Sequence, residues 1–358
     1  MSLLNFGSTL PAGTLSFLCK ICGEACSVVA AELGREIPSC AHCGSTVRMR
    51  GMVHALSTAL FFKSLAIPDF PERKDLLGKG MSDWEGYAKP LAKKLGYTNT
   101  FYHKPPRLYI TQITQEDQAS VDFLLSTDVF EHVNPPVSRA FENARAMLRG
   151  NGAFVFSVPY VLTGQTTEHF PNLFEYRIEN RGAKKILVNK TREGRTEEFE
   201  NLVFHGGEGE TLETRVFSLP NLLNDLAHAG FADVKVMSEP CFEHGIFWPQ
   251  PWSLPIIARP SVPSVVVSDW GPRSSFISAP ANQNQSDCGA IWIKTELILD
   301  KPPMITVGDL KAQGVVCGKQ LVTAFVPAEI SRVAGKYPVV IESAGFAATL
   351  VGELLIHD

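Results

Sequence analysis

Five cysteines lie close together near the start of the chain. Cys19 and Cys22 form one Cys-x-x-Cys-Gly unit, Cys40 and Cys43 form a second, and 17 residues separate the two units. The glycine after each pair favours a tight turn whose backbone amides face both thiolates. Two such turns supply four sulfurs with the tetrahedral geometry of a closed zinc site. We therefore expect Cys19, Cys22, Cys40 and Cys43 to bind one structural Zn²⁺.

Two alternatives to a zinc site are a pair of disulfides and a redox-active Cys-x-x-Cys. An intracellular setting disfavours disulfides, and the duplicated spacing disfavours a redox site. Cys26 and His42 lie close enough in sequence to replace one of the four ligands. A segment this short buries too little apolar surface to fold alone, so the metal would supply much of its folding free energy.

Two histidines, His169 and His205, lie in a long segment of irregular pattern, residues 160–216. Histidine titrates near neutral pH, so either side chain could act as the general base that removes a proton from an acceptor group. His205 begins a glycine-rich run, His-Gly-Gly-Glu-Gly, which suits a mobile lid. The alternative is that each histidine only hydrogen-bonds the backbone of its own loop.

A short glycine-containing run is typical of a turn that binds a ligand. Gly78 and Gly80 follow a strand-like run, and Ser82 with Glu85 forms a capping box that predicts the start of a helix. Glycines let the backbone approach a ligand closely, and a helix N-terminus favours negative charge. The position of these glycines directly before a capping box therefore predicts an anion-binding turn.

The elements that would position these residues alternate between strands and helices. Helices are expected near residues 82–96, 135–150 and 218–230. Strands are expected at residues 74–77, 97–103, 108–113, 121–126, 153–158, 233–237 and 253–258. This alternation predicts an α/β domain with a parallel sheet, and such sheets bind ligands at the carboxyl ends of their strands.

Over residues 74–259, the order of these strands and helices resembles that of the class I S-adenosylmethionine-dependent methyltransferases. The run Asp-Phe-Leu-Leu-Ser-Thr-Asp-Val-Phe-Glu-His-Val, from residue 122, looks like the fourth strand of that family and its following loop. Residues 145–159 look like the next helix end, glycine turn and fifth strand. The resemblance implies a Rossmann-like sheet, S-adenosylmethionine as cofactor, and a substrate wall built from residues 160–216.

The resemblance also implies which residues contact the cofactor. Tyr102 and His103 stand where the family has an acidic residue that holds the ribose, and Ser82 stands near its usual third glycine. The positions after the fourth strand would line the crevice beside the adenine and the methionine part. The complete implied cofactor set is Gly78, Gly80, Ser82, Tyr102, His103, Asp128, Val129 and Phe130.

The pattern changes near residue 260, where helical periodicity ends and short β-rich runs begin. About 95 residues with strands at this spacing are typical of a small β-sandwich of immunoglobulin-like type. The sequence therefore predicts three domains. These are a zinc ribbon plus helix at 1–66, a methyltransferase domain at 67–259 with its insertion at 160–216, and an all-β sandwich at 260–358.

Composition narrows the classes of function. The 358 residues are 45% hydrophobic and 20% charged, which is typical of a folded globular protein. A net charge of −4 supplies no overall field to attract nucleic acid or an anionic membrane. No apolar run approaches the ~20 residues of a membrane span, and the first residues lack the pattern of a signal peptide. A cytoplasmic location is therefore expected.

Three functions are consistent with these features. The first is a methyltransferase that acts on a small molecule or glycan, by O- or N-methylation, with a protein partner docking on the β-sandwich. The second is an RNA methyltransferase that uses the zinc ribbon for docking, although a net charge of +2 over residues 1–65 is small for binding phosphates, so nucleic acid is not an expected partner. The third is a non-catalytic binding or scaffold protein with the same fold.

Overall fold

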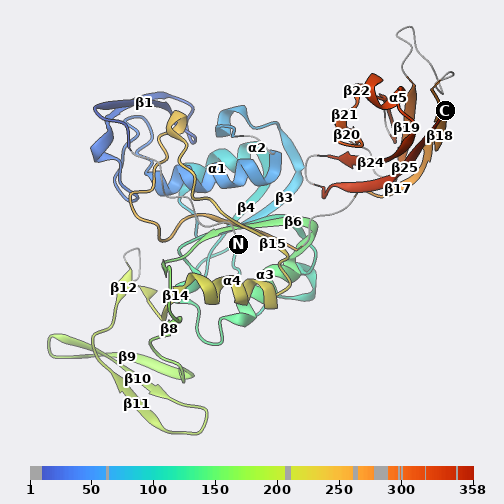
Figure 1. Ribbon diagram of the computed structural model, residues 1–358. Helices are drawn as coiled ribbons and strands as arrows, with labels where there is room; N and C mark the ends of the chain where they lie inside the picture. The colour runs from blue at the N-terminus through green and yellow to red at the C-terminus, as the bar shows by residue number, and fades with distance from the viewer. Residues whose placement is uncertain are drawn as a thin grey trace. The chain divides into compact units, whose positions relative to one another are not determined.

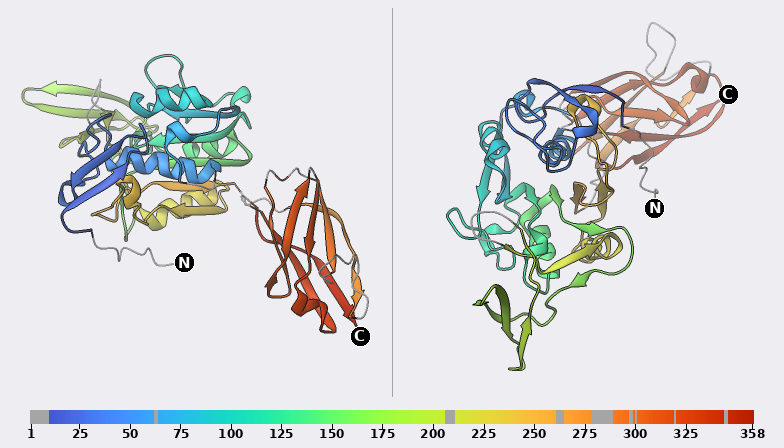
Figure 2. Two further views of the ribbon diagram at one scale, coloured as in Figure 1. Left: turned by 90° about the horizontal axis from the view of Figure 1, so that it is seen from above. Right: turned by 90° about the vertical axis from the view of Figure 1, so that its left-hand side faces the viewer.

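The computed structural model describes residues 10–61, 64–205, 211–260, 265–277, 289–296, 299, 301–318, 320–343 and 346–358. The chain divides into two compact units, Met1–Ser261 and Val262–Asp358. Figures 1 and 2 show the elements of each unit. Among the described residues, no helix is long and apolar enough to cross a membrane. The finer domain boundaries expected from the sequence stay predictions.

A six-stranded sheet forms the centre of the first unit. Its strands, in spatial order, are β15 (Asp233–Val236), β16 (Ile256–Arg259), β6 (Leu148–Ser157), β5 (Val121–Thr127), β3 (Arg73–Met81) and β4 (Leu95–Thr100). The four strands β3 to β6 are parallel, whereas β16 is antiparallel to both of its neighbours. Because β4 and β5 lie on opposite sides of β3, the topological switch point lies between the carboxyl ends of β3 and β5.

Helices cover both faces of this sheet, as Figure 1 shows. Phe123 and Leu125 of β5 point to the face covered by α1 (Val47–Phe61) and α2 (Glu85–Lys94). Leu124, between them, points to the face covered by α3 (Ser138–Met147) and α4 (Leu219–His228). Successive strand residues face opposite ways, so an uninterrupted apolar strand indicates a sheet buried on both faces.

The cysteine-rich segment begins with a hairpin of β1 (Thr14–Leu18) and β2 (Ala25–Val29), followed by the short helix η1 (Ala30–Glu32). Phe17 and Ile21 of this segment are buried in the same apolar core as helix α1 and the central sheet. The ribbon therefore does not depend only on its own few apolar residues for a core.

The insertion between β6 and α4 is built almost wholly of short strands. They are β7 (Tyr160–Val161), β8 (Thr167–Glu168), β9 (Glu175–Arg181), β10 (Lys184–Lys190), β11 (Thr196–Phe199), β12 (Phe204–His205), β13 (Thr211–Leu212) and β14 (Arg215–Ser218). Strands β9 to β11 form an antiparallel meander, and β14 lies between β7 and β8. Figure 1 shows the meander extending away from the central sheet.

The second unit consists of two sheets around one apolar core. One sheet has the order β17 (Val267–Gly271), β19 (Ala290–Thr295), β23 (Leu321–Phe325) and β22 (Gln313–Gly318). The other has the order β18 (Ser274–Phe276), β25 (Thr349–His357), β24 (Gly335–Glu342), β20 (Met304–Val307) and β21 (Leu310–Lys311), and the short helix α5 spans Ala328–Ser331. The immunoglobulin-like type expected for this unit stays a prediction.

The structure corrects the expected glycine turn. Strand β3 continues to Met81, so Gly78 and Gly80 lie inside the strand and not in a loop after it. A Cβ atom at Gly78 would lie 2.1 Å from the ring of Phe123, and one at Gly80 would lie 1.9 Å from the hydroxyl of Tyr97. Both positions therefore require glycine because neighbouring aromatic side chains fill the space.

Three further expectations about local structure are wrong. The capping box does not form, because α2 begins at Glu85 with Trp84 as its N-cap and no side-chain cap. No strand forms at residues 108–113, which are irregular. Strand β4 ends at Thr100, so Tyr102 and His103 belong to the following loop. Each error concerns a short run whose conformation depends on its tertiary neighbours.

Candidate functional site

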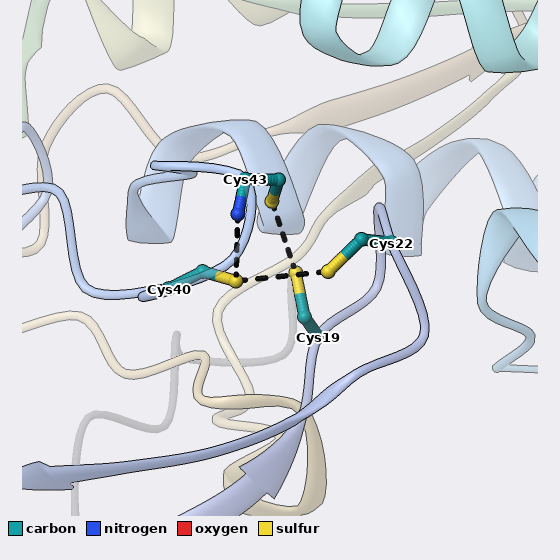
Figure 3. A group of neighbouring side chains, drawn as sticks. All are labelled: Cys19, Cys22, Cys40 and Cys43. Atoms are coloured by element: carbon teal, nitrogen blue, oxygen red, sulfur yellow. Dashed lines mark hydrogen bonds between the residues drawn. The ribbon is translucent and has the colours of Figure 1, made fainter.

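The four cysteines of the two Cys-x-x-Cys-Gly units converge on one point. Their sulfur atoms lie within 4.8 Å of one another, with 3.6 Å between Cys19 and Cys43 and 3.6 Å between Cys22 and Cys40, as Figure 3 shows. These separations are far beyond a disulfide bond of ~2.05 Å, and the cysteines are free thiols. The group can therefore hold a metal ion.

The backbone around these sulfurs has the expected turn geometry. Gly23 and Gly44 both have φ in the left-handed region, at +78° and +71°. The amide of Ile21 lies 3.5 Å from the Cys19 sulfur, and the amide of Cys43 lies 3.4 Å from the Cys40 sulfur. Such N–H groups stabilise the negative charge of metal-bound thiolates.

A buried arginine lies beside the four sulfurs. Arg50 of α1 is fully buried and donates to the carbonyl and hydroxyl oxygens of Ser45, at 2.8 Å and 3.2 Å. The Ser45 hydroxyl in turn lies 3.3 Å from the Cys19 sulfur. Burial lowers the pKa of Arg50, and the neighbouring cysteines oppose that shift. Four thiolates around one Zn²⁺ carry a net charge of −2, which this guanidinium partly offsets.

The two alternative ligands occupy different places. Cys26 is buried, and its sulfur lies 3.4 Å from the Cys40 sulfur, whereas the side chain of His42 is exposed. Neither belongs to the group of four ligand atoms that lie within 4.8 Å of one another.

Two residues with left-handed backbone flank the switch point of the central sheet. Ser82, directly after β3, has φ of +58°, and Asp128, directly after β5, has φ of +50°. Non-glycine residues adopt this conformation rarely, and such strain concentrates at functional sites. The exposed side chain of Ser82 lies three residues before helix α2, whose N-terminal amides face the same edge of the sheet.

A buried carboxylate lies behind this turn. Asp83 is 4% exposed and accepts hydrogen bonds from the hydroxyls of Tyr87, at 2.7 Å, and Tyr97, at 2.6 Å. Burial raises the pKa of Asp83 to about 6, although these hydroxyls oppose the shift. Its backbone bonds in both directions with the side chain of Asn99 at the end of β4. Asp83 therefore links β3, β4 and α2 and is not free to bind a ligand.

The carboxylate of Asp128 is paired within the protein. Arg35 donates to its two oxygens at 3.0 Å and 2.8 Å, and the hydroxyl of Ser157 donates at 2.7 Å. Arg48 of α1 lies 3.6 Å away and also pairs with Glu36. Burial would raise the pKa of Asp128, but the two arginines hold it below its ordinary value. These ion pairs connect the cysteine-rich segment to the carboxyl edge of the sheet.

The remaining residues of the implied cofactor set differ in how deeply their side chains are buried. The ring of Phe130 is fully buried against Phe141 and Phe154, so the expectation that its side chain lines the crevice is corrected. Val129 is half-buried beside this core. Tyr102 and His103 are exposed, and their rings contact each other edge to face.

A second polar cluster brings the insertion against the loop after β5. We call it the His/Glu cluster. Glu213 joins the two predicted bases, because its carboxylate lies 3.1 Å from His169 Nε2 and 3.0 Å from His205 Nε2. An ionised carboxylate only accepts hydrogen bonds, so His169 donates to it, whereas His205 Nε2 contacts it as a close charge partner. The cluster comprises Glu131, His132, His169, His205 and Glu213.

The short helix η4 (Phe130–His132) supplies the other two members. Glu131 is fully buried, and His132 donates its Nδ1–H to the carbonyl oxygen of Leu212 at 2.9 Å. The rings of His132 and His205 meet edge to face, with centroids 4.9 Å apart. Burial, and then the charge of Asp128, raises the pKa of Glu131, and burial lowers the pKa of His132.

Thr214, directly before β14, and Arg215, the first residue of β14, hold η4 in place. Thr214 donates to the carbonyl of Glu131 from both its backbone amide, at 2.8 Å, and its hydroxyl, at 2.7 Å. Arg215, fully buried, donates to the carbonyls of Phe130 and Val133 and forms a paired contact with both oxygens of Glu168. The insertion therefore positions the loop that follows β5.

Sequence reasoning identified His169 and His205 as one pair of candidates and missed their partners. Glu131 and His132 were visible only as part of the motif after the fourth strand, and Glu213 lies 82 positions beyond Glu131. Contacts over such separations follow from the fold and not from local spacing. The Glu-His pair directly after a buried strand was the one local signal that pointed to them.

Comparisons with known proteins add the following. No family model matches the chain, and no curated protein matches it. A solved S-adenosylmethionine-dependent methyltransferase from Clostridium acetobutylicum is 11% identical, covering 52% of this chain and 84% of its own, with a TM-score of 0.29. One from Mesorhizobium loti is 15% identical, covering 54% and 94%, with a TM-score of 0.31.

A sugar N-methyltransferase from Streptoalloteichus is 11% identical and covers 58% of this chain and 87% of its own, with a TM-score of 0.32. The structures to which the chain is similar thus include S-adenosylmethionine-dependent methyltransferases.

Proposed function

We propose that the protein is a class I S-adenosylmethionine-dependent methyltransferase acting on a small molecule or glycan. The observation that carries this proposal is the order of the central sheet. Four parallel strands have their switch point between β3 and β5, and one reversed strand, β16, lies between β6 and β15. A reversed strand in this position is typical of the class I methyltransferase fold.

The residues at the switch point fit the proposed cofactor. The left-handed turn at Ser82 leads into the N-terminus of α2, which suits the carboxylate of the methionine part. The exposed rings of Tyr102 and His103, in the loop after β4, are suited to the adenosine part. When bound, S-adenosylmethionine supplies a methyl group on a sulfonium, which a nucleophilic oxygen or nitrogen of the acceptor can take.

The His/Glu cluster suits the acceptor side of the same edge. His169 donates its Nε2–H to Glu213, and His205 Nε2 lies 3.0 Å from the same carboxylate, whose negative charge favours a proton on that nitrogen. The second nitrogen of each imidazole is then the basic one, which can take a proton from the acceptor. The cluster lies between η4, directly after β5, and the insertion, so an acceptor bound there would be next to the switch point.

Calorimetric titration with S-adenosylmethionine tests the proposal. Tyr102 is 61% exposed, so Tyr102→Ala should leave the fold intact while removing a stacking surface. Stacking of a base on an aromatic ring contributes about 1–3 kcal/mol, so affinity should fall about 5- to 150-fold. Phe276→Ala, which removes an exposed aromatic ring of β18 in the second unit, is the matched control and should bind like the wild type.

A second candidate, a non-catalytic binding protein with this fold, is favoured by one observation. The Asp128 carboxylate, expected to face the cofactor, is instead occupied by Arg35 and Ser157. The same titration separates the two candidates. No heat of binding with S-adenosylmethionine at millimolar concentration would exclude the methyltransferase and leave the binding protein.

A further inference from the structure

We propose that Glu131, His132 and His205 form a binding site for a divalent transition-metal ion, separate from the four-cysteine site. One ligand atom from each of the three residues lies within 4.8 Å of the other two. Glu131 Oε1 is 3.7 Å from His132 Nε2 and 4.0 Å from His205 Nδ1. The three side chains thus surround one small volume beside the loop after β5.

The first observation behind this site is the state of Glu131. Its side chain is 0% exposed, and neither carboxylate oxygen has a hydrogen-bond partner among the described residues. Burying a carboxyl group without partners costs several kcal/mol, and folded proteins rarely tolerate it. The imidazole nitrogens at 3.7 Å and 4.0 Å are too far away for hydrogen bonds.

The second observation is the orientation of the two histidines. His132 Nδ1 lies 2.9 Å from the carbonyl oxygen of Leu212, which can only accept, so Nδ1 carries the hydrogen. His205 Nε2 lies 3.0 Å from a carboxylate oxygen of Glu213, and the negative charge of this oxygen favours the hydrogen on Nε2 over Nδ1. In neutral imidazoles, His132 Nε2 and His205 Nδ1 are then lone-pair acceptors, and both face Glu131.

These two observations together point to a bound cation. Two ring lone pairs and a carboxylate face one another with no donor between them. A proton on Glu131 could serve one acceptor at hydrogen-bond distance, but none of these pairs is that close. A metal ion can bind all three at once. Ligand atoms ~2.1 Å from a tetrahedral zinc lie ~3.4 Å apart, so the separations of 3.7 Å and 4.0 Å from Glu131 would shorten on binding.

The surroundings of the ligands match those of known metal sites. A ligating histidine usually donates its other N–H to a backbone carbonyl or a carboxylate, which sets its tautomer and orientation. Leu212 and Glu213 do this for His132 and His205. Two imidazoles and one carboxylate favour Zn²⁺ or a similar first-row ion over Mg²⁺ and Ca²⁺, which prefer oxygen ligands. Three protein ligands leave a position open.

The open position gives the site a role that rests on the proposed function. An acceptor hydroxyl bound there would have a lowered pKa, because the metal stabilises the oxyanion. The hydroxyl would lose its proton to His169 and gain the methyl group, while the sulfonium becomes a neutral thioether. In this arrangement His205 binds the metal and His169 accepts the proton. The substrate class is a hydroxyl-bearing acceptor that undergoes O-methylation.

Zinc content after equilibrium dialysis against micromolar Zn²⁺ at pH 7.5 tests the site. Elemental analysis should give two zinc ions per chain for the wild type, one in each site. Glu131→Gln, which has nearly the same shape, and His205→Ala, at a 39% exposed side chain, should each give one. His228→Ala removes an exposed imidazole in the last turn of α4 and should give two.

Two results would overturn the site. One is a single zinc ion in the wild type, and the other is two zinc ions in both cluster variants, provided circular dichroism shows that each is folded. Neither result depends on S-adenosylmethionine, so the site can fail while the titration with that cofactor succeeds. Conversely, two zinc ions without cofactor binding would leave the site in place and remove only its role in methyl transfer.

Discussion

Replacing Arg215 with methionine should destabilise the unit that contains the central sheet. Arg215 is fully buried in β14 and donates four hydrogen bonds, two to Glu168 and two to the carbonyls of Phe130 and Val133. Methionine keeps most of the apolar stem but removes the guanidinium. The change therefore isolates the polar contacts that hold η4 against the insertion.

The loss of unfolding free energy depends on the polar groups that lose their partner when the guanidinium is removed. Removing one partner of a buried ion pair costs about 3–5 kcal/mol, mainly because the other charge stays desolvated. Glu168 is 30% exposed and can regain water, and Val133 O still accepts from the hydroxyl of Thr214. We therefore expect about 3 kcal/mol, which for a unit of this size lowers the melting temperature by roughly 6–12 °C.

Differential scanning calorimetry of the full chain is the assay, and Arg181→Met is the matched control. Arg181 of β9 also donates to two carboxylates, those of Glu179 and Glu198, but the guanidinium itself is 46% exposed, whereas that of Arg215 is fully buried. Exposed pairs contribute little, so this variant should melt with the wild type. Equal shifts for the two variants would show that burial of Arg215 does not decide its contribution, and the reasoning would fail.

Four further outcomes are expected. Cys40→Ser should lower the zinc content by one ion per chain, and an unchanged content would contradict the four-cysteine site. Ser82→Gly should raise the free energy of unfolding by about 0.5–1 kcal/mol, measured with urea, because glycine adopts the left-handed backbone without strain. Gly80→Ala should lower the melting temperature, since the new Cβ atom would collide with Tyr97, and a variant as stable as the wild type would show that the strand yields there. The pKa of Asp83 is about 6 in the folded protein and about 4 in the unfolded chain, so the folded state binds this proton more tightly. The resulting stabilisation is complete below pH 4, and the free energy of unfolding should fall by on the order of 3 kcal/mol as the pH rises through 6. Asp83→Asn should remove this pH dependence.

Local patterns in the sequence predicted the elements that local chemistry decides. The run Val-Asp-Phe-Leu-Leu-Ser at 121–126 predicted strand β5, confirmed as Val121–Thr127, since consecutive apolar residues such as Phe123, Leu124 and Leu125 are typical of a strand buried on both faces. The two Cys-x-x-Cys-Gly units predicted the group of four sulfurs, because the geometry of each half is contained within five residues. The change of pattern near residue 260 lies close to the division between the two compact units.

Local patterns failed where an element depends on its neighbours. Gly78 and Gly80 have the spacing of a turn, but the rings of Phe123 and Tyr97 on adjacent strands account for them. The capping-box pair Ser82 and Glu85 does not cap, because Ser82 adopts a left-handed conformation at the switch point. Sequence spacing carries no information on which side chains of other strands will occupy the space beside a residue.

The sequence by itself determined the classes of residue available for chemistry, and the tertiary structure decided which of them meet. Four cysteines in two short turns need only one closed loop to converge. Glu131 and His132 meet His205 only because the insertion returns to the sheet at the start of β14, where Thr214, directly before the strand, and Arg215 bind the backbone of η4. Contacts between residues more than 70 positions apart depend on the packing of whole elements, and the free energy of that packing is spread over the fold.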